Sequence, residues 1–114
     1  MKTIAPAVLL LLAGCASGPA GPTGLSATRS RTLEKMLVPQ FDVATVPAQY
    51  RADFYAVLDI FARGRRPDEF VLRAEFALTG EITLYFSNSG MHGGGFAIFR
   101  RQNGQWIEDK GYFA

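Results

Sequence analysis

The clearest hydrophobic pattern in the chain predicts a helix over residues 47–63. Its apolar side chains recur every three or four positions and so share one helical face, namely Tyr50, Phe54, Val57, Leu58 and Phe61. Pro47 suits the first turn, where its missing N–H is not needed, and Thr45 is the expected N-cap. Gly64 suits the left-handed position after a helix, and Pro67 prevents continuation. We expect the apolar face to lie in the core.

From residue 68 onward the hydrophobic period changes to two, which is typical of half-buried strands. The apolar set of the first strand is Phe70, Leu72, Ala74, Phe76 and Leu78. The second strand continues this face with Ile82, Leu84 and Phe86. A three-residue loop over 78–80, with Gly80 at positive φ, keeps both sets on one face, whereas a two-residue loop would separate them. We therefore expect these pairs: Phe76 with Ile82, Ala74 with Leu84, and Leu72 with Phe86.

A second hairpin is predicted over residues 96–113. Asn103-Gly104 favours a type I′ turn, which pairs Gln102 with Gln105 and Arg100 with Ile107. One side of this hairpin carries Phe96, Ile98, Ile107 and Phe113. The other side carries Ala97, Phe99, Trp106 and Tyr112. Two apolar sides indicate either a curled sheet that wraps the helix or an apolar surface left for a partner.

These elements predict a single small α+β domain over residues 31–114. One long helix packs on a curved four-stranded antiparallel meander, because the apolar sheet face needs a cover. Residues 31–46 predict a short helix or an edge strand, with Pro39 ending any helix near Val38. The order resembles the cystatin-like and the related nuclear-transport-factor-like arrangements. The Gln-x-Val-x-Gly loop of cystatin inhibitors is absent, so protease inhibition does not follow from the topology.

The first 15 residues predict a secreted, lipid-anchored protein. Lys2 precedes an apolar run of about 9 residues, which is too short for a membrane span of roughly 20. Leu12-Ala13-Gly14-Cys15 then resembles the lipobox of bacterial lipoproteins. The resemblance implies cleavage before Cys15 and a lipid on its thiol, and Ala16 in place of Asp favours the outer membrane. The alternative is an ordinary signal peptide cut elsewhere.

Composition narrows the classes of function. Cys15 is the only cysteine, so the domain has no disulfide framework and no cysteine-based metal site. With 12 Lys and Arg against 10 Asp and Glu, the chain has no strong basic bias for nucleic acid. The lipobox resemblance implies that residues 1–14 are a signal peptide and that residues 15–30 are a lipidated cysteine followed by a tether, which the Gly/Pro-rich composition predicts to be flexible. We expect no metal and no cofactor.

The candidate chemistry gathers in residues 87–95, which hold the only histidine, His92. Five hypotheses remain open for this segment. It could supply a nucleophile and base (Ser87 or Ser89 with His92), a metal ligand (His92) or a phosphate site on the three glycines. It could also contact a partner through Met91 and His92, or serve only as a passive connection. The basic cluster Arg63, Arg65 and Arg66 either complements the helix dipole or contacts anionic lipid headgroups or lipopolysaccharide. The acidic set Glu69, Glu75 and Glu81 predicts a solvated face.

These observations favour a non-enzymatic outer-membrane lipoprotein whose periplasmic domain is a binding or accessory module. Its partner is the membrane, through Cys15, and an envelope protein. The expected contact residues are Met91, His92, Arg100 and Trp106. The alternative is a binder of a small molecule or lipid, with a pocket between helix and sheet lined by Phe54, Phe61, Phe76 and Phe86. A third hypothesis is an enzyme with His92 as base.

Overall fold

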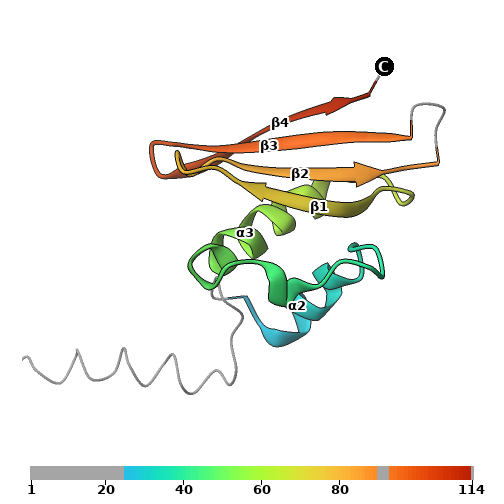
Figure 1. Ribbon diagram of the computed structural model, residues 1–114, viewed down its shortest axis with the longest axis horizontal. Coiled ribbons are helices and arrows are strands. Elements are labelled where there is room, and N and C mark those ends of the chain that lie inside the picture. Colours follow the sequence, from blue (N-terminus) through green and yellow to red (C-terminus); the bar gives the residue numbers. More distant parts are fainter. Residues whose placement is uncertain (1–24, 90–92, 114) are drawn as a thin grey trace, which may run out of the picture.

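The protein is an α+β fold with an open four-stranded antiparallel sheet, seen in a computed structural model that describes residues 25–89 and 93–113 (Figure 1). The strands are neighbours in chain order, β1-β2-β3-β4. The elements are α2 (Ala27–Glu34), a short 3-10 helix η1 (Val43–Thr45), α3 (Ala48–Gly64), β1 (Phe70–Phe76), β2 (Ile82–Ser87), β3 (Gly94–Gln102) and β4 (Gln105–Tyr112). This confirms the α+β class and the antiparallel meander.

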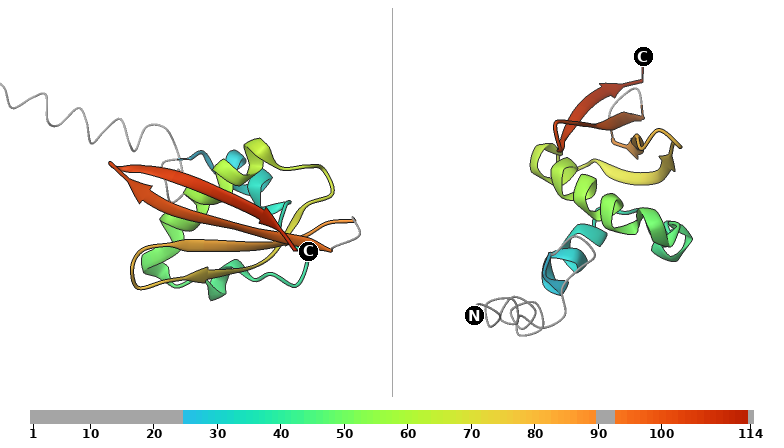
Figure 2. Two further views of the ribbon diagram at one scale, coloured as in Figure 1. Left: turned by 90° about the horizontal axis from the view of Figure 1, so that it is seen from above. Right: turned by 90° about the vertical axis from the view of Figure 1, so that its left-hand side faces the viewer.

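The elements stack in layers, with α3 between the sheet and α2 (Figures 1 and 2). The apolar face of α3 is wholly buried at Phe54, Val57, Leu58 and Phe61, as the helical period predicts. From the sheet, Ile82, Leu84 and Phe86 of β2 and Ala97 and Phe99 of β3 join the same core. The other face of the sheet is covered by no helix or strand in the described part of the chain.

The predicted ends of the long helix are wrong in detail. Thr45 does not cap α3, because it lies in η1 and its hydroxyl donates to the carbonyl oxygen of Asp42 over 2.6 Å. Pro47 is the N-cap and makes no side-chain capping bond. Gly64 is the last helical residue and keeps a negative φ, so the helix ends without a left-handed glycine.

The expectation of one long helix is also incomplete, because α2 begins inside the segment predicted as a tether. Ser26 is its N-cap, and the Ser26 hydroxyl oxygen accepts from the backbone N–H of Arg29 over 3.0 Å. Leu33 then packs into the core with 1% exposure. The tether prediction is therefore wrong for residues 27–30, and residues 15–24 lie outside the described part of the chain. Of the two alternatives predicted for residues 31–46, a short helix is present, because α2 extends to Glu34, whereas the edge strand is absent and the chain forms η1 there.

A register shift in β1 overturns one predicted face. Phe76 pairs with Ile82 and Ala74 with Leu84 as expected, but a bulge near Leu72 places Val71, not Leu72, opposite Phe86. Val71 is consequently buried, and Leu72 is 44% exposed. The backbone of Val71 also bonds to Met36 and Val38 on the open side of β1. This pairing with residues 36–38 explains why the alternation of buried and exposed side chains breaks at Val71 and Leu72.

Both hairpin turns form as the sequence predicts. The three residues 78–80 connect β1 to β2, with Gly80 at φ 96°. Asn103 and Gly104 both have positive φ, and Gln102 pairs with Gln105. The second hairpin has Arg100 opposite Ile107, as expected.

Two glycine substitutions are expected to act in opposite directions. Gly80→Ala should lower the free energy of unfolding by about 1–2 kcal/mol, because the positive φ strains an L-residue although nothing lies within 4 Å. Gly64→Ala meets the same open space at helical φ, so it should be neutral or stabilising by up to about 1 kcal/mol. Urea unfolding of both variants measures this, and equal effects would contradict the turn geometry.

Candidate functional site

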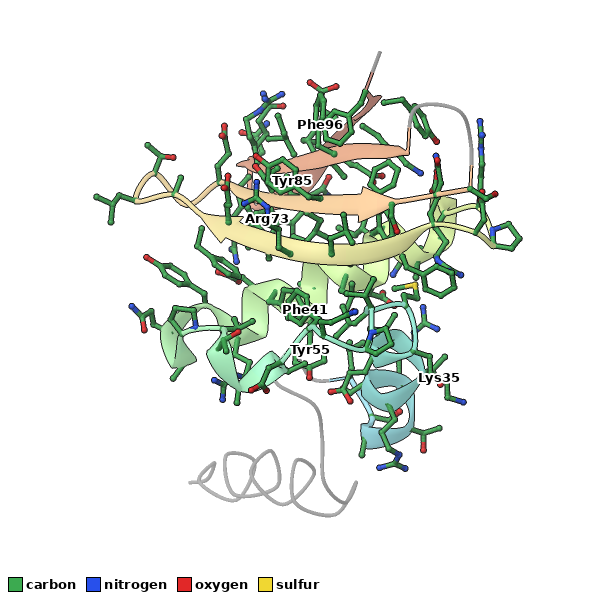
Figure 3. The ribbon with its side chains drawn as sticks, turned by 45° about the vertical axis from the view of Figure 1, so that its right-hand side comes forward. Lys35, Phe41, Tyr55, Arg73, Tyr85 and Phe96 are labelled. Atoms are coloured by element: carbon green, nitrogen blue, oxygen red, sulfur yellow. The ribbon has the colours of Figure 1, made fainter. Side chains whose placement is uncertain are left out.

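The most distinctive surface of the protein is an aromatic cluster on the face of the sheet that is turned away from α3. Cross-strand pairing puts Tyr85 opposite Phe96, and Arg100 opposite Ile107. Figure 3 shows Arg73, Tyr85 and Phe96 on three neighbouring strands. We call this surface the open sheet face and define it by its apolar members Tyr85, Phe96, Ile98, Ile107 and Phe113.

The aromatic rings of the open sheet face are held close to the backbone. The rings of Phe96 and Phe113 lie 6.1 Å apart. Phe96 also lies across Gly111, where an added Cβ would come within 2.8 Å of the ring. Ile107 and Phe113 are 40% and 42% exposed. A contiguous, half-exposed apolar patch on an ordered sheet is typical of a binding surface rather than a catalytic one.

An ionic group borders this face on β1. The Arg73 guanidinium pairs with Glu75 over 2.5 Å and lies 3.9 Å over the centre of the Tyr85 ring. The Tyr85 hydroxyl donates to Glu75 over 2.9 Å, and this hydrogen bond raises the pKa of the phenol. The hydrogen bond from Arg73 lowers the pKa of the Glu75 carboxyl. These interactions hold each group in its ordinary charge state and fix the positions of the three side chains.

The two predicted contact residues that the structure describes, Arg100 and Trp106, lie on opposite faces of the sheet. Arg100 lies on the open sheet face, exposed, opposite Ile107. Trp106 lies on the opposite face, where its ring packs against the core and under the guanidinium of Arg101, 4.5 Å from the ring centre. Met91 and His92 lie outside the described residues. Strand alternation separates the tryptophan from the arginine, because each residue of β4 faces the side opposite to its neighbour.

Hydrogen bonds to Asp68 hold the start of the connection between β2 and β3 in place. Asp68 accepts hydrogen bonds from both the backbone N–H of Ser89, over 3.0 Å, and the Ser89 hydroxyl, over 2.7 Å. These bonds lower the pKa of the Asp68 carboxyl. The Ser89 hydroxyl is thus committed to a carboxylate. Gly94 follows at φ 137°, and an added Cβ would lie 2.0 Å from the carbonyl oxygen of Phe86.

A buried ionic cluster joins the two edges of the sheet beneath β2 and β3. The Glu69 side chain is wholly buried and accepts from Lys110 over 2.6 Å and from the Tyr112 hydroxyl over 2.8 Å. The backbone N–H of Arg66 adds a third bond, over 3.1 Å. Burial raises the pKa of the Glu69 carboxyl, but these bonds outweigh it and leave the pKa lowered. The prediction of a solvated Glu69 is therefore wrong.

The position of Lys110 in the second hairpin is a sequence signal for this cluster. The register of the second hairpin places Lys110 opposite Ala97, on the side that faces α3. Its ammonium lies 5.2 Å from the ring centre of Phe61 and 5.1 Å from that of Phe86. A cation among core aromatics requires a buried acceptor, which the preceding elements supply as Glu69. The cluster is structural, since its charged atoms are turned inward.

The predicted pocket between helix and sheet is filled by packing. Phe54, Phe61 and Phe86 have no exposed surface, and the rings of Phe61 and Phe86 lie 5.5 Å apart. A surface pocket of about 290 Å³ lies between residues 40–47 and β1 instead, and shares only Phe76 with the predicted lining. This pocket is a feature of the sheet edge.

Within residues 25–89 and 93–113, no group of three or more His, Cys, Asp or Glu side chains is placed to hold a metal ion. The helices of this part of the chain are also too short or too polar to cross a membrane. Comparisons with protein-family models, with curated proteins and with solved structures find no match for this chain.

Proposed function

We propose that the protein is a bacterial outer-membrane lipoprotein whose domain is a non-enzymatic binding module in the periplasm. The anchor is the lipobox cysteine, Cys15, which lies outside the described residues. The domain would bind an envelope protein that presents an apolar surface. The observation that carries this proposal is the open sheet face, a row of aromatic and aliphatic side chains that no described element covers.

The chemistry of this face supports binding rather than turnover. Of its charged side chains, Arg73 and Glu75 neutralise each other, while Arg100 is exposed opposite Ile107, and its rings are held close to the sheet. A rigid aromatic patch loses little conformational entropy on binding and supplies much apolar area. The packed core gives no comparable support to the alternative, a ligand pocket between helix and sheet. The proposal also keeps the curved, cystatin-like order of the sheet, which the bulge near Leu72 favours because bulges increase local twist.

A photo-crosslinking amino acid in place of Ile107 tests the binding surface. In cells that make the full chain, position 107 should give a discrete adduct with one protein. The matched control is Leu78, an aliphatic residue that is 99% exposed at the turn between β1 and β2 and lies off the open sheet face. Phe96→Ala should lower the yield at position 107 by tenfold or more, since it removes the central ring of the patch.

Two outcomes would contradict the proposal. Equal adducts at positions 78 and 107 would mean that the open sheet face has no preferred partner. A small molecule retained by the purified chain, with no protein adduct, would favour the ligand-binding alternative. The anchor is tested separately by mass spectrometry of the intact protein beside a Cys15→Ala form. Absence of a lipid-sized mass on Cys15 would contradict the lipoprotein assignment.

A further inference from the structure

The charges of the domain are unevenly distributed. One part, made of α2 with Lys35 and of residues 59–66 at the end of α3 and just after it, carries six cationic and two acidic side chains. The rest of the described chain carries five cationic and eight acidic ones. The six cations are Arg29, Arg31, Lys35, Arg63, Arg65 and Arg66, which we call the basic surface. Such a separation gives the domain a positive end although its net charge is small.

Tertiary contacts bring the two halves of the basic surface together. Asp59 of α3 pairs with Arg29 of α2 over 2.7 Å and with Arg63 over 2.6 Å. A groove of about 410 Å³ lies between α2 and the segment after α3. Its lining includes the cations Arg29, Lys35 and Arg65 and the apolar side chains Leu33, Met36 and Phe70. Leu33 and Met36 are buried core residues, whereas Phe70 is 38% exposed. Cations beside an exposed aromatic side chain suit the headgroup region of a phospholipid.

Several of these cations are free to bind an external anion. Arg31 and Lys35 are exposed, one turn apart on α2, and form no ion pair with the described residues. Figure 3 shows Lys35 at the outer side of α2. Arg66 is exposed and lies over the ring of Tyr112, 5.2 Å from its centre, and its charge interacts with the Asp68 carboxylate. Arg31 and Lys35 are therefore the cations of the basic surface that are best placed to bind an external anion.

The position of the proposed lipid anchor indicates which anion these cations bind. The described chain begins at Leu25, immediately before α2, and Cys15 precedes it by ten residues. Ten residues reach at most about 35 Å. The α2 layer lies on the side of α3 away from the sheet (Figures 1 and 2). A bilayer that holds Cys15 is thus close to the basic surface.

We infer that the basic surface binds anionic phospholipid headgroups of the membrane that holds Cys15, and thereby turns the open sheet face toward the periplasm. The inference rests on the proposed lipid anchor. The acyl chains would supply attachment, and the basic surface would supply orientation. Each Lys or Arg near an anionic surface favours the bound orientation by about fivefold. The lipid anchor and the basic surface would both leave the open sheet face accessible, because that face lies on the opposite side of the domain.

Fluorescence quenching in vesicles measures this orientation. The full chain, purified with its lipid, takes one thiol-reactive fluorophore at Thr28→Cys on α2 or at Gln105→Cys on β4, both exposed positions. Vesicles contain phosphatidylcholine with or without 30% phosphatidylglycerol, plus a headgroup-linked quencher. With phosphatidylglycerol, the probe at 28 should be quenched several-fold more than the probe at 105. Without it, or at about 0.5 M salt, the difference should disappear.

A charge-matched pair of variants locates the contact. Arg31→Gln with Lys35→Gln should lower the orientation preference by about 25-fold. Arg73→Gln with Arg100→Gln removes the same charge from the sheet and should leave the preference unchanged. Equal quenching of both probes on anionic vesicles, or loss of the preference only in the sheet variant, would overturn the inference. Two fluorophores per chain would instead reveal a free Cys15 thiol, and would contradict the anchor on which both proposals rest.

Discussion

Replacing Lys110 by methionine is expected to lower the free energy of unfolding by about 3–5 kcal/mol. The substitution keeps most of the side-chain volume but removes the ammonium that lies 2.6 Å from Glu69. The Glu69 carboxylate then stays wholly buried without its charge partner, and only the Tyr112 hydroxyl and the Arg66 N–H still bond to it. Urea unfolding followed by circular dichroism measures the loss. Lys35→Met, at an exposed lysine without an ion pair, is the matched control, with an expected change below about 0.5 kcal/mol.

The pH dependence identifies the buried carboxylate as the cause. The pKa of Glu69 is lowered from 4.5 in the folded protein, so its contribution to stability is complete above pH 4.5 and is lost as the pH falls below that value. Without Lys110, burial raises the pKa of Glu69, so the variant protonates this carboxylate at a higher pH than wild type does. The difference between wild type and Lys110→Met should therefore shrink as the pH falls, and shrink further below pH 4.5, where wild type loses its own contribution. Lys110→Met combined with Glu69→Gln should recover at least half of the loss at pH 7. A loss independent of pH and of Glu69 would mean that packing alone explains the effect.

Phe61→Ala should cost about 3–5 kcal/mol, whereas the same change at Phe113 should cost less than about 1 kcal/mol. Phe61 is fully buried on α3 and packs against Phe86 and Lys110. Phe113 is 42% exposed on the open sheet face and contacts the ring of Phe96. Its truncation leaves no internal cavity. Thermal and urea unfolding of the two variants give the comparison.

The variants Phe61→Ala and Phe113→Ala also distinguish an effect on stability from an effect on partner binding. Phe113→Ala should weaken the photo-crosslinked adduct at position 107 while the domain stays folded. Phe61→Ala should affect the adduct only in proportion to the fraction unfolded, because its side chain has no exposed surface. Comparable destabilisation by both substitutions would place Phe113 in the core. It would then remove the distinction between the two faces of the sheet.

Much of the fold follows from local patterns in the sequence. The long helix, the four strands and both turns were predictable, because a period of 3.6 or 2 and the backbone needs of Gly80 and Asn103-Gly104 act over a few residues. The pairings Phe76 with Ile82 and Gln102 with Gln105 follow directly from those turns. The open sheet face was foreseen as one of two apolar sides of the second hairpin. Its opposite side became core when α3 covered it.

The remaining features depend on contacts between residues far apart in the chain, so local pattern misplaces them. Val71 and Leu72 exchange roles because residues 36–38 pair with the edge of β1 and a bulge accommodates the change. Glu69 alternates like a surface residue, yet Lys110 and Tyr112 of the far edge strand enclose it. The basic surface combines residues of α2 and α3, which core packing and the ion pairs of Asp59 with Arg29 and Arg63 hold together. Local patterns in the sequence therefore specify the positions of the helices, strands and turns. Which charges are buried and which share a face depends on the tertiary structure, because burial and long-range charge pairing are properties of the packed layers.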